Sequence, residues 1–230
     1  MNTTTLADLL RRARARADMP VGGALTQKDW IDNLNAYGAE LHDLIIASFE
    51  DRVEDVQTFA ASAVNSSGEY ALPSLYLKTL SMDYTTGGYT YTVPKYENAE
   101  RNTRQTLTGA RFATLSEFQY RVVGNVIRFI PVPSSSSGGD FTHRYAPEYR
   151  ALVELTDPVP PWIKPGWEEY QVLGAAADAR VAEETDETPL LRRQEMLRDR
   201  IIAAAQTKDA NEPARVIDVR GAQEREGRGW

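Results

Sequence analysis

The sequence predicts an α+β fold that is mainly a helical bundle of about four helices, with a small antiparallel β-sheet inserted into it and an extended C-terminal arm. Two regions, at the start of the chain and before its last segment, carry apolar residues at helical spacing. The region between them is rich in Tyr, Thr and Val and contains a two-residue turn signal. We therefore expect N-terminal helices in 1–69, a β-rich insertion in 70–156, C-terminal helices in 157–210 and an arm in 211–230.

A first short helix is predicted over residues 5–17. Thr4 or Thr5 can cap its N-terminus, and Asp8 falls in the first turn, where the helix dipole favours negative charge. The inner face carries Leu6, Leu9, Leu10, Ala13 and Ala17. The other face carries Arg11, Arg12, Arg14 and Arg16. This pattern is typical of a helix that buries its leucine face and exposes its arginine face.

A second helix is predicted to begin at Thr26, with Asp29 three residues later as a partial capping-box signal. Its apolar stripe is the clearest periodic signal in the chain, and it predicts a core-forming helix. The stripe consists of Trp30, Leu34, Tyr37, Leu41, Leu44, Ile45 and Ser48. His42 lies on the polar side and is expected to be solvated.

The middle of the chain favours strands. Residues 50–70 are ambiguous, and a short helix followed by a turn at 65–68 fits them. Alternating residues in 118–122, the turn Gly124-Asn125 and the apolar run 126–130 predict a hairpin. Residues 141–146 could add a third strand. The tyrosines at 84, 89 and 91 have few basic neighbours, so strand packing fits them better than base stacking.

Two antiparallel helices are predicted near the end of the chain. A proline-rich connector over 157–166 precedes Trp167, which opens a helix with Tyr170, Leu173, Ala177 and Val181 on one stripe. Thr188-Pro189 is a strong start signal for the next helix, because proline suits the first helical position. The residues expected inward on that helix are Leu190, Gln194, Leu197, Ile201, Ala204 and Ala205.

Composition excludes several classes of function. The net charge of -7, from 26 basic and 33 acidic residues, disfavours general duplex binding, because phosphates require a basic surface. Cysteine is absent, which excludes disulfides, thiolate zinc sites and cysteine nucleophiles. The chain contains neither a signal-peptide pattern nor an apolar run of 18 residues, so we expect a protein made in a cytoplasm without a membrane span.

Catalytic patterns are weak. The two histidines, His42 and His143, show neither metal-ligand spacing nor a nucleophile elbow, although Ser137 and Asp140 lie near His143 in sequence. The pairs Glu168-Glu169 and Glu183-Glu184 are adjacent on helices, where neighbouring side chains point about 100° apart and seldom converge on one substrate. A solvated helix face explains both pairs. We expect no cofactor and no metal.

The arginine face of the first helix has two interpretations. The residues Arg11, Arg12, Arg14 and Arg16 could be solvent-exposed with intrahelical ion pairs, which is the usual case. Alternatively, they could dock on an acidic partner surface, since interfaces favour arginine over lysine.

Several short motifs follow one another along the chain. In chain order they are the segment 9–19, the residues Trp30 and Asn35, and the segments 40–44, 100–102, 120–125, 129–131, 166–170, 208–210 and 217–219. Over roughly residues 6–220, their order resembles that of the head-to-tail adaptor, or head-completion, proteins of tailed bacteriophages.

This resemblance implies a structural protein of the virion neck, assembled in the host cytoplasm, and not an enzyme. It implies identical subunits in a dodecameric ring on the portal protein. The ring would extend the channel through which genomic DNA passes without specific binding, and tail, stopper or nozzle proteins would dock on it.

The arm would then bind the portal or a neighbouring subunit. Twenty extended residues reach about 65 Å, well beyond the radius of gyration of about 17 Å expected for the rest of the chain. The residues expected to make this contact are Arg215, Val216, Ile217, Asp218, Val219, Arg220 and Trp230.

Two alternatives remain open at this point. The first is a virion-associated cell-wall hydrolase that uses a glutamate such as Glu168 or Glu184. The second is another neck component, a stopper or a tail terminator. Those proteins are usually smaller and dominated by strands, which the predicted helices argue against.

Overall fold

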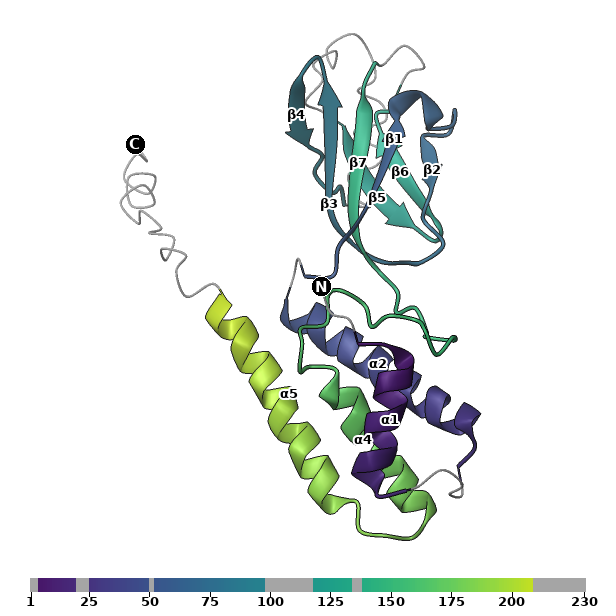
Figure 1. The fold of residues 1–230 in the computed structure, drawn as a ribbon. Helices are drawn as coiled ribbons and strands as arrows, with labels where there is room; N and C mark the ends of the chain where they lie inside the picture. Colours follow the sequence, from purple (N-terminus) through teal and green to yellow (C-terminus); the bar gives the residue numbers. More distant parts are fainter. Residues whose placement is uncertain (1–3, 20–24, 50–51, 98–117, 134–137, 209–230) are drawn as a thin grey trace, which may run out of the picture.

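The computed structural model describes residues 4–19, 25–49, 52–97, 118–133 and 138–208. These ranges form two bodies stacked end to end, one helical and one of strands (Figure 1). The helices are α1 (Leu6–Ala17), α2 (Gln27–Ser48), α4 (Glu169–Ala182) and α5 (Thr188–Lys208), and a short 3-10 helix spans Ala61–Ala63. The strands are β1 (Asp55–Ala60), β2 (Glu69–Ala71), β3 (Tyr76–Thr86), β4 (Tyr89–Thr92), β5 (Gln119–Val123), β6 (Val126–Ile130) and β7 (Asp140–Pro147).

The helices α1 and α2 begin where the sequence predicts. Thr5 Oγ1 accepts the Asp8 N–H at 3.4 Å, and the Thr5 N–H donates to the Asp8 carboxylate at 3.2 Å. Thr26 and Asp29 form the same reciprocal pair at 3.3 and 2.8 Å. These bonds satisfy backbone groups that the first turn of a helix leaves unpaired. All five residues predicted for the inner face of α1 are buried.

The helical body is organised around α4, which packs against α1, α2 and α5. Buried residues cover nearly the whole circumference of α4, and the small side chains from Gly174 to Ala177 let its neighbours approach closely. The predicted single stripe therefore describes α4 incompletely, and its last member, Val181, is exposed near the end of the helix. None of the helices in the described ranges has the length and apolar character that crossing a membrane requires.

The strands form two antiparallel sheets, with the orders β1-β7-β3-β4 and β2-β6-β5. The hairpin of β5 and β6 is the predicted one, and Gly124 at its turn has a φ of 59°, a conformation that favours glycine. β7 is the predicted third strand. It lies inside the larger sheet, with Phe141 opposite both Phe59 of β1 and Tyr84 of β3.

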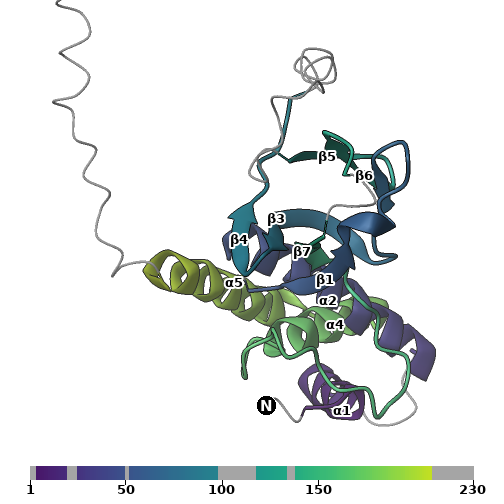
Figure 2. The same ribbon diagram turned by 90° about the horizontal axis from the view of Figure 1, so that it is seen from above.

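The two sheets face each other across an aromatic core, and Figure 2 shows them as separate layers. The ring of Phe141 on β7 lies 4.4 Å from that of Phe129 on β6, and the ring of Phe59 stacks on Tyr70 of β2 at 3.7 Å. Tyr84 is fully buried against Phe141. Because aromatic rings bury large apolar areas, the strands have a hydrophobic core of their own, distinct from that of the helices.

Asn35 on α2 ties the helical body to the segment that leaves β7. Its Oδ1 accepts the Leu152 N–H at 2.8 Å and the Tyr149 hydroxyl at 3.2 Å, and its Nδ2 donates to the Leu152 carbonyl at 2.8 Å. Tyr149 also leans over Gly38, where an added Cβ would lie 2.2 Å from the Tyr149 hydroxyl oxygen. The segment that follows β7 is therefore held to α2 by specific contacts.

The predicted fold class, mainly a helical bundle with one small sheet, is wrong. The described residues form a mixed α+β fold with seven strands in two sheets. The edge strand β1 buries only Phe59, so it shows no alternation of polar and apolar residues. Strand β3 has two register shifts against β7, which interrupt its period of two. The division into the four ranges 1–69, 70–156, 157–210 and 211–230 remains a prediction, and the arm lies outside the described residues.

Candidate functional site

Arginines of α1 are cross-linked to glutamates at the start of α4. Arg12 Nη1 donates to Glu168 Oε1 at 3.2 Å, and its Nη2 pairs with Glu169. Arg16 reaches the other oxygen of Glu169 at 2.8 Å. Burial opposes the charge of Arg12, but the hydrogen bonds to Glu169 and Glu168 outweigh it and raise the pKa of the guanidinium. This network fixes α1 against α4.

The prediction that Glu168 and Glu169 form a solvated helix face is therefore wrong. Glu168 is only 5% exposed, and it also accepts the Gly166 N–H at 2.6 Å. Glu168 caps α4, and its backbone conformation is already helical. The side chains of Glu168 and Glu169 therefore do point in different directions, as expected for neighbours on a helix. They still converge, because the long side chain of Arg12 spans the gap between them.

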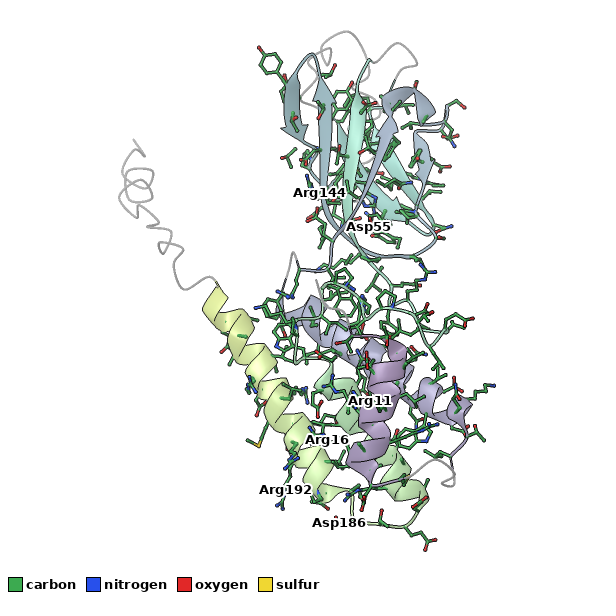
Figure 3. All side chains as sticks on the ribbon, viewed as in Figure 1. Arg11, Arg16, Asp55, Arg144, Asp186 and Arg192 are labelled. Carbon is green, nitrogen blue, oxygen red and sulfur yellow. The ribbon has the colours of Figure 1, made fainter. Side chains whose placement is uncertain are left out.

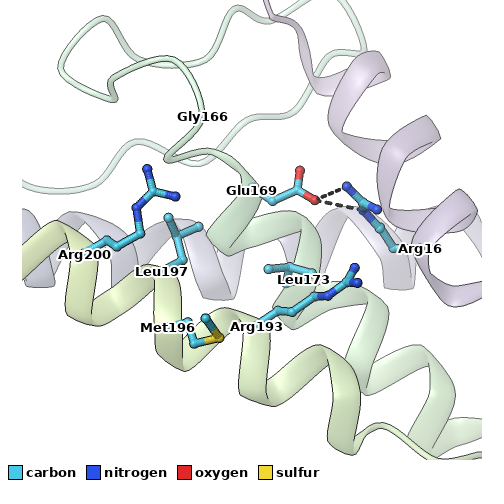
Figure 4. A pocket seen from close by; sticks show the side chains of 8 residues that line it. All are labelled: Arg16, Gly166, Glu169, Leu173, Arg193, Met196, Leu197 and Arg200. Atoms are coloured by element: carbon cyan, nitrogen blue, oxygen red, sulfur yellow. Dashed lines mark hydrogen bonds and ion pairs between the residues drawn. The ribbon is translucent and has the colours of Figure 1, made fainter.

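A pocket of about 300 Å³ opens beside this network, between α1, α4 and α5 (Figure 4). Its floor is apolar, formed by Leu173 of α4 and Leu197 of α5. Its walls carry Arg16, Glu169, Arg193 and Arg200, and Met196 lies between the two arginines of α5. The lining residues are Arg16, Gly166, Glu169, Leu173, Arg193, Met196, Leu197 and Arg200.

The pocket carries net positive charge. The carboxylate of Glu169 is already paired with Arg12 and Arg16, and the carboxylate of Glu168 with Arg12, so these four charges balance. Arg193 and Arg200 form no ion pair with any residue in the described ranges. Two guanidinium groups above an apolar floor suit a carboxylate carried next to an apolar side chain.

The arginine face of α1 is divided between two environments. Arg12 and Arg16 join the network with α4, whereas Arg11 is exposed and lies 3.8 Å from Asp8 in its own helix. Arg14 is partly buried and forms no ion pair with a described residue. Whether any of these arginines binds another chain remains a prediction.

The histidines are packing residues in this structure. His42 is 1% exposed, so the prediction that it is solvated is wrong, because Trp162 of the connector covers its ring at 5.1 Å. His143 is buried on β7, where Thr79 Oγ1 lies 3.0 Å from its Nε2. Burial lowers the pKa of His143 to about 4. Ser137 lies outside the described residues, so no triad geometry is present in the part that the structure describes.

Neither of the glutamates proposed for hydrolysis, Glu168 and Glu184, lines the pocket described above. Glu168 is held in the network with Arg12, and Glu184 is exposed in the loop after α4. No group of three or more potential metal ligands gathers within the described ranges. The predicted arm residues, Arg215 to Arg220 and Trp230, lie outside the described residues.

Sequence reasoning missed the α5 side of the pocket. Arg193, Met196 and Arg200 follow at spacings of three and four residues, which places them on one face of a helix. That signal was available in the sequence. Its partners, Arg16 and Glu169, come from distant segments, so only the fold shows that these residues line one pocket.

Comparison with curated proteins gives no match. A family model described as SU10 adaptor protein matches residues 4–217, which includes both bodies, the pocket and the connector between the bodies. The match supports the role of a bacteriophage adaptor, a structural protein of the virion, and interaction with portal and tail proteins in general. It confirms the resemblance to head-to-tail adaptors seen in the sequence, and the chain belongs to the SU10 adaptor protein family.

Proposed function

We propose that the protein is a head-to-tail adaptor that assembles as a ring on the portal, extends the DNA channel and docks tail, stopper or nozzle proteins, without catalysing a reaction. The match of the adaptor family to residues 4–217 carries this proposal. We also propose, from the resemblance to head-to-tail adaptors, that the ring has twelve subunits, lies at the neck of the virion and is assembled from chains made in the host cytoplasm.

The two-body architecture supports a bridging role. The helical body and the two-sheet body each have their own hydrophobic cluster, so each keeps its shape while it presents a separate surface. An adaptor needs two such surfaces, because one partner lies above it and another below. The hydrogen bonds of Asn35 hold the segment that leaves β7 against α2.

The arm 211–230 is proposed to bind the portal or a neighbouring subunit through Arg215, Val216, Ile217, Asp218, Val219, Arg220 and Trp230. Deletion of 211–230 should leave a folded protein that no longer binds the portal stably. Pull-down on immobilised portal measures this directly. Equal binding with and without the arm would refute its role.

The channel role predicts weak interaction with DNA. Tight phosphate binding would hinder passage of the genome, and the net charge of -7 agrees with a surface that does not retain DNA. Fluorescence anisotropy with labelled duplex should detect no binding at 150 mM salt, a concentration near physiological ionic strength. Tight, salt-sensitive binding of DNA by the isolated protein would contradict a channel lining.

The central experiment is direct imaging. The purified protein is mixed with portal rings of the same phage and examined by electron microscopy, with subunit number measured by native mass spectrometry. We expect one additional ring of density on the portal, with twelve copies of the chain. Portal rings that remain bare at micromolar protein would refute the proposal.

The alternatives receive no specific support. The hydrolase hypothesis needs a glutamate that is free to contact a substrate, but Glu168 is bound by Arg12 and by a backbone N–H. The predicted excess of helix argues against a stopper or a tail terminator, but the seven strands in the described ranges weaken this argument. The match to the adaptor family is the stronger reason to prefer an adaptor over these other neck proteins.

A further inference from the structure

The exposed face of α2 is acidic and lined with small residues. Asp32, Ala36, Glu40, Asp43 and Ala47 are all exposed. Their spacings of three and four residues place them on one stripe, opposite the buried residues that pack on α4. Glu40 also accepts the hydroxyl of Tyr170 on α4 at 3.2 Å, while Asp32 forms no ion pair with a described residue. This stripe presents negative charge to solvent along one helix.

The stripe and the arginine pocket match in spacing. Arg193 and Arg200 are seven residues apart on α5, which is about 10 Å along a helix, and Asp32 and Glu40 are eight apart on α2, which is about 12 Å. Met196 lies between the arginines and is 68% exposed, and Ala36 lies between the two acids. A methionine opposite an alanine lets two helices approach closely, so charge and shape fit together.

The two surfaces lie on different sides of the helical body. In Figure 1, α1 lies in front of α4 and α2 passes behind it, and Figure 2 shows α1 at one edge with α4 next to it. The pocket opens between α1 and α5, whereas the acidic stripe lies on the exposed side of α2, from which only Glu40 reaches α4, through the Tyr170 hydroxyl. One chain therefore cannot bring them together, but two copies can.

A ring requires this kind of arrangement. Cyclic assemblies with more than two subunits use heterologous contacts, in which one surface binds a different surface on the next copy. When many subunits close a ring, each turns only slightly from its neighbour, so the two surfaces must face nearly opposite directions. The pocket and the α2 stripe lie on different sides of the helical body, which agrees with this condition.

We propose that the pocket formed by Arg16, Arg193 and Arg200 receives the acidic stripe of α2 from the next copy of this chain. Arg193 and Arg200 pair with Asp32 and Glu40 of the neighbour, and Met196 packs on its Ala36. This contact rests on the proposed ring and identifies the surfaces that hold it together. Arg16 is occupied by Glu169 and frames the pocket without adding free charge.

Another acidic segment of the chain fits less well. The loop between α4 and α5 carries Glu183, Glu184, Asp186 and Glu187 and lies at the end of the helical body, where Figure 3 labels Asp186. A loop at the end of the body and a pocket on its side do not face opposite directions, so their contact would turn each subunit sharply. Asp186 is also engaged locally, since it accepts the Thr188 N–H at 3.0 Å.

Site-specific disulfides test the contact, because the chain has no cysteine of its own. The double variant Ala36→Cys/Met196→Cys is assembled on portal rings and oxidised mildly with copper phenanthroline. We expect a ladder of covalent oligomers on denaturing gels without reductant. The matched control is Ala36→Cys/Tyr89→Cys, since Tyr89 is as exposed as Met196 but lies on β4, and it should give no ladder.

Charge exchange gives an independent test. Arg193→Glu/Arg200→Glu and Asp32→Lys/Glu40→Lys each place like charges opposite each other, so each alone should lower ring yield at least about tenfold. Mixed in equal amounts they should recover most of the yield, because in an alternating ring every contact is again complementary. Circular dichroism confirms that each variant is folded.

The outcomes separate this contact from the function on which it rests. Rings that form on the portal but give no ladder at positions 36 and 196, and tolerate either charge reversal, would overturn the contact and leave the adaptor function intact. Portal rings that stay bare with the wild-type protein would overturn both. A ladder with recovery in the mixture supports the contact, and binding of the pocket to a different acidic protein instead would refute it.

Discussion

Replacement of Gly174 with alanine should destabilise the protein, although alanine favours helices. Gly174 lies in the middle of α4, where an added Cβ would lie 2.4 Å from Tyr37 Cδ1 and 2.6 Å from Gln194 Nε2. Ordinary carbon–carbon contacts are about 3.5–4.0 Å, so the Tyr37 ring would have to move by more than about 1 Å. Such a movement would also strain the hydrogen bond from the Tyr37 hydroxyl to Asp178, now 2.9 Å long.

The expected magnitude follows from opposing effects. Overpacking of a core costs about 1–3 kcal/mol, and loss of a hydrogen bond to a charged group costs about 1.5–3 kcal/mol. Alanine in place of glycine inside a helix returns about 1 kcal/mol. We expect a net loss of about 1.5–5 kcal/mol, which lowers the melting temperature by at least about 3 °C for a protein of this size.

Thermal unfolding followed by circular dichroism measures this loss, and urea unfolding checks it. The variant Tyr37→Leu removes the ring that obstructs the new methyl group, so adding Gly174→Ala to it should cost much less than adding it to the wild type. A Gly174→Ala protein as stable as the wild type, or more stable, would refute the packing described for α2, α4 and α5.

Three further predictions concern other parts of the structure. Arg12→Ala should lower the free energy of unfolding by about 2–3 kcal/mol, because it leaves Glu168 buried without its cation. The control Arg11→Ala should lower it by less than about 0.5 kcal/mol, and urea unfolding compares the two variants. Asn35→Ala should cost about 2 kcal/mol by the same assay, since it removes three hydrogen bonds to the segment after β7. The pKa of His143 is 6.5 in the unfolded chain and about 4 in the folded protein. The stability that neutral His143 contributes is therefore fully present above pH 6.5 and is lost as the pH falls toward 4. His143→Gln should flatten the pH dependence of the free energy of unfolding between pH 6.5 and 4, and an unchanged slope would contradict this prediction.

The sheets show why part of the fold was accessible from sequence and part was not. The hairpin of β5 and β6 has a short loop and regular alternation, both visible within a dozen residues. The larger sheet joins β1 to β7 across the 79 residues between Ala60 and Asp140, with Asp55 opposite Tyr145. No local pattern indicates which distant segments will pair, and one small sheet was therefore predicted where there are two.

The candidate site shows the same division. The sequence by itself indicated that a threonine at position 4 or 5 caps α1, that the leucines of this helix face inward and that four arginines lie on its other faces, because helix capping and periodicity act over three or four residues. Only the tertiary structure decided that Arg12 binds Glu168, 156 residues away, and that Arg16 and Arg200 line one pocket. Only packing decided that His42 is buried and that α4 is covered on nearly all sides, since the burial of a side chain depends on which other segments lie over it.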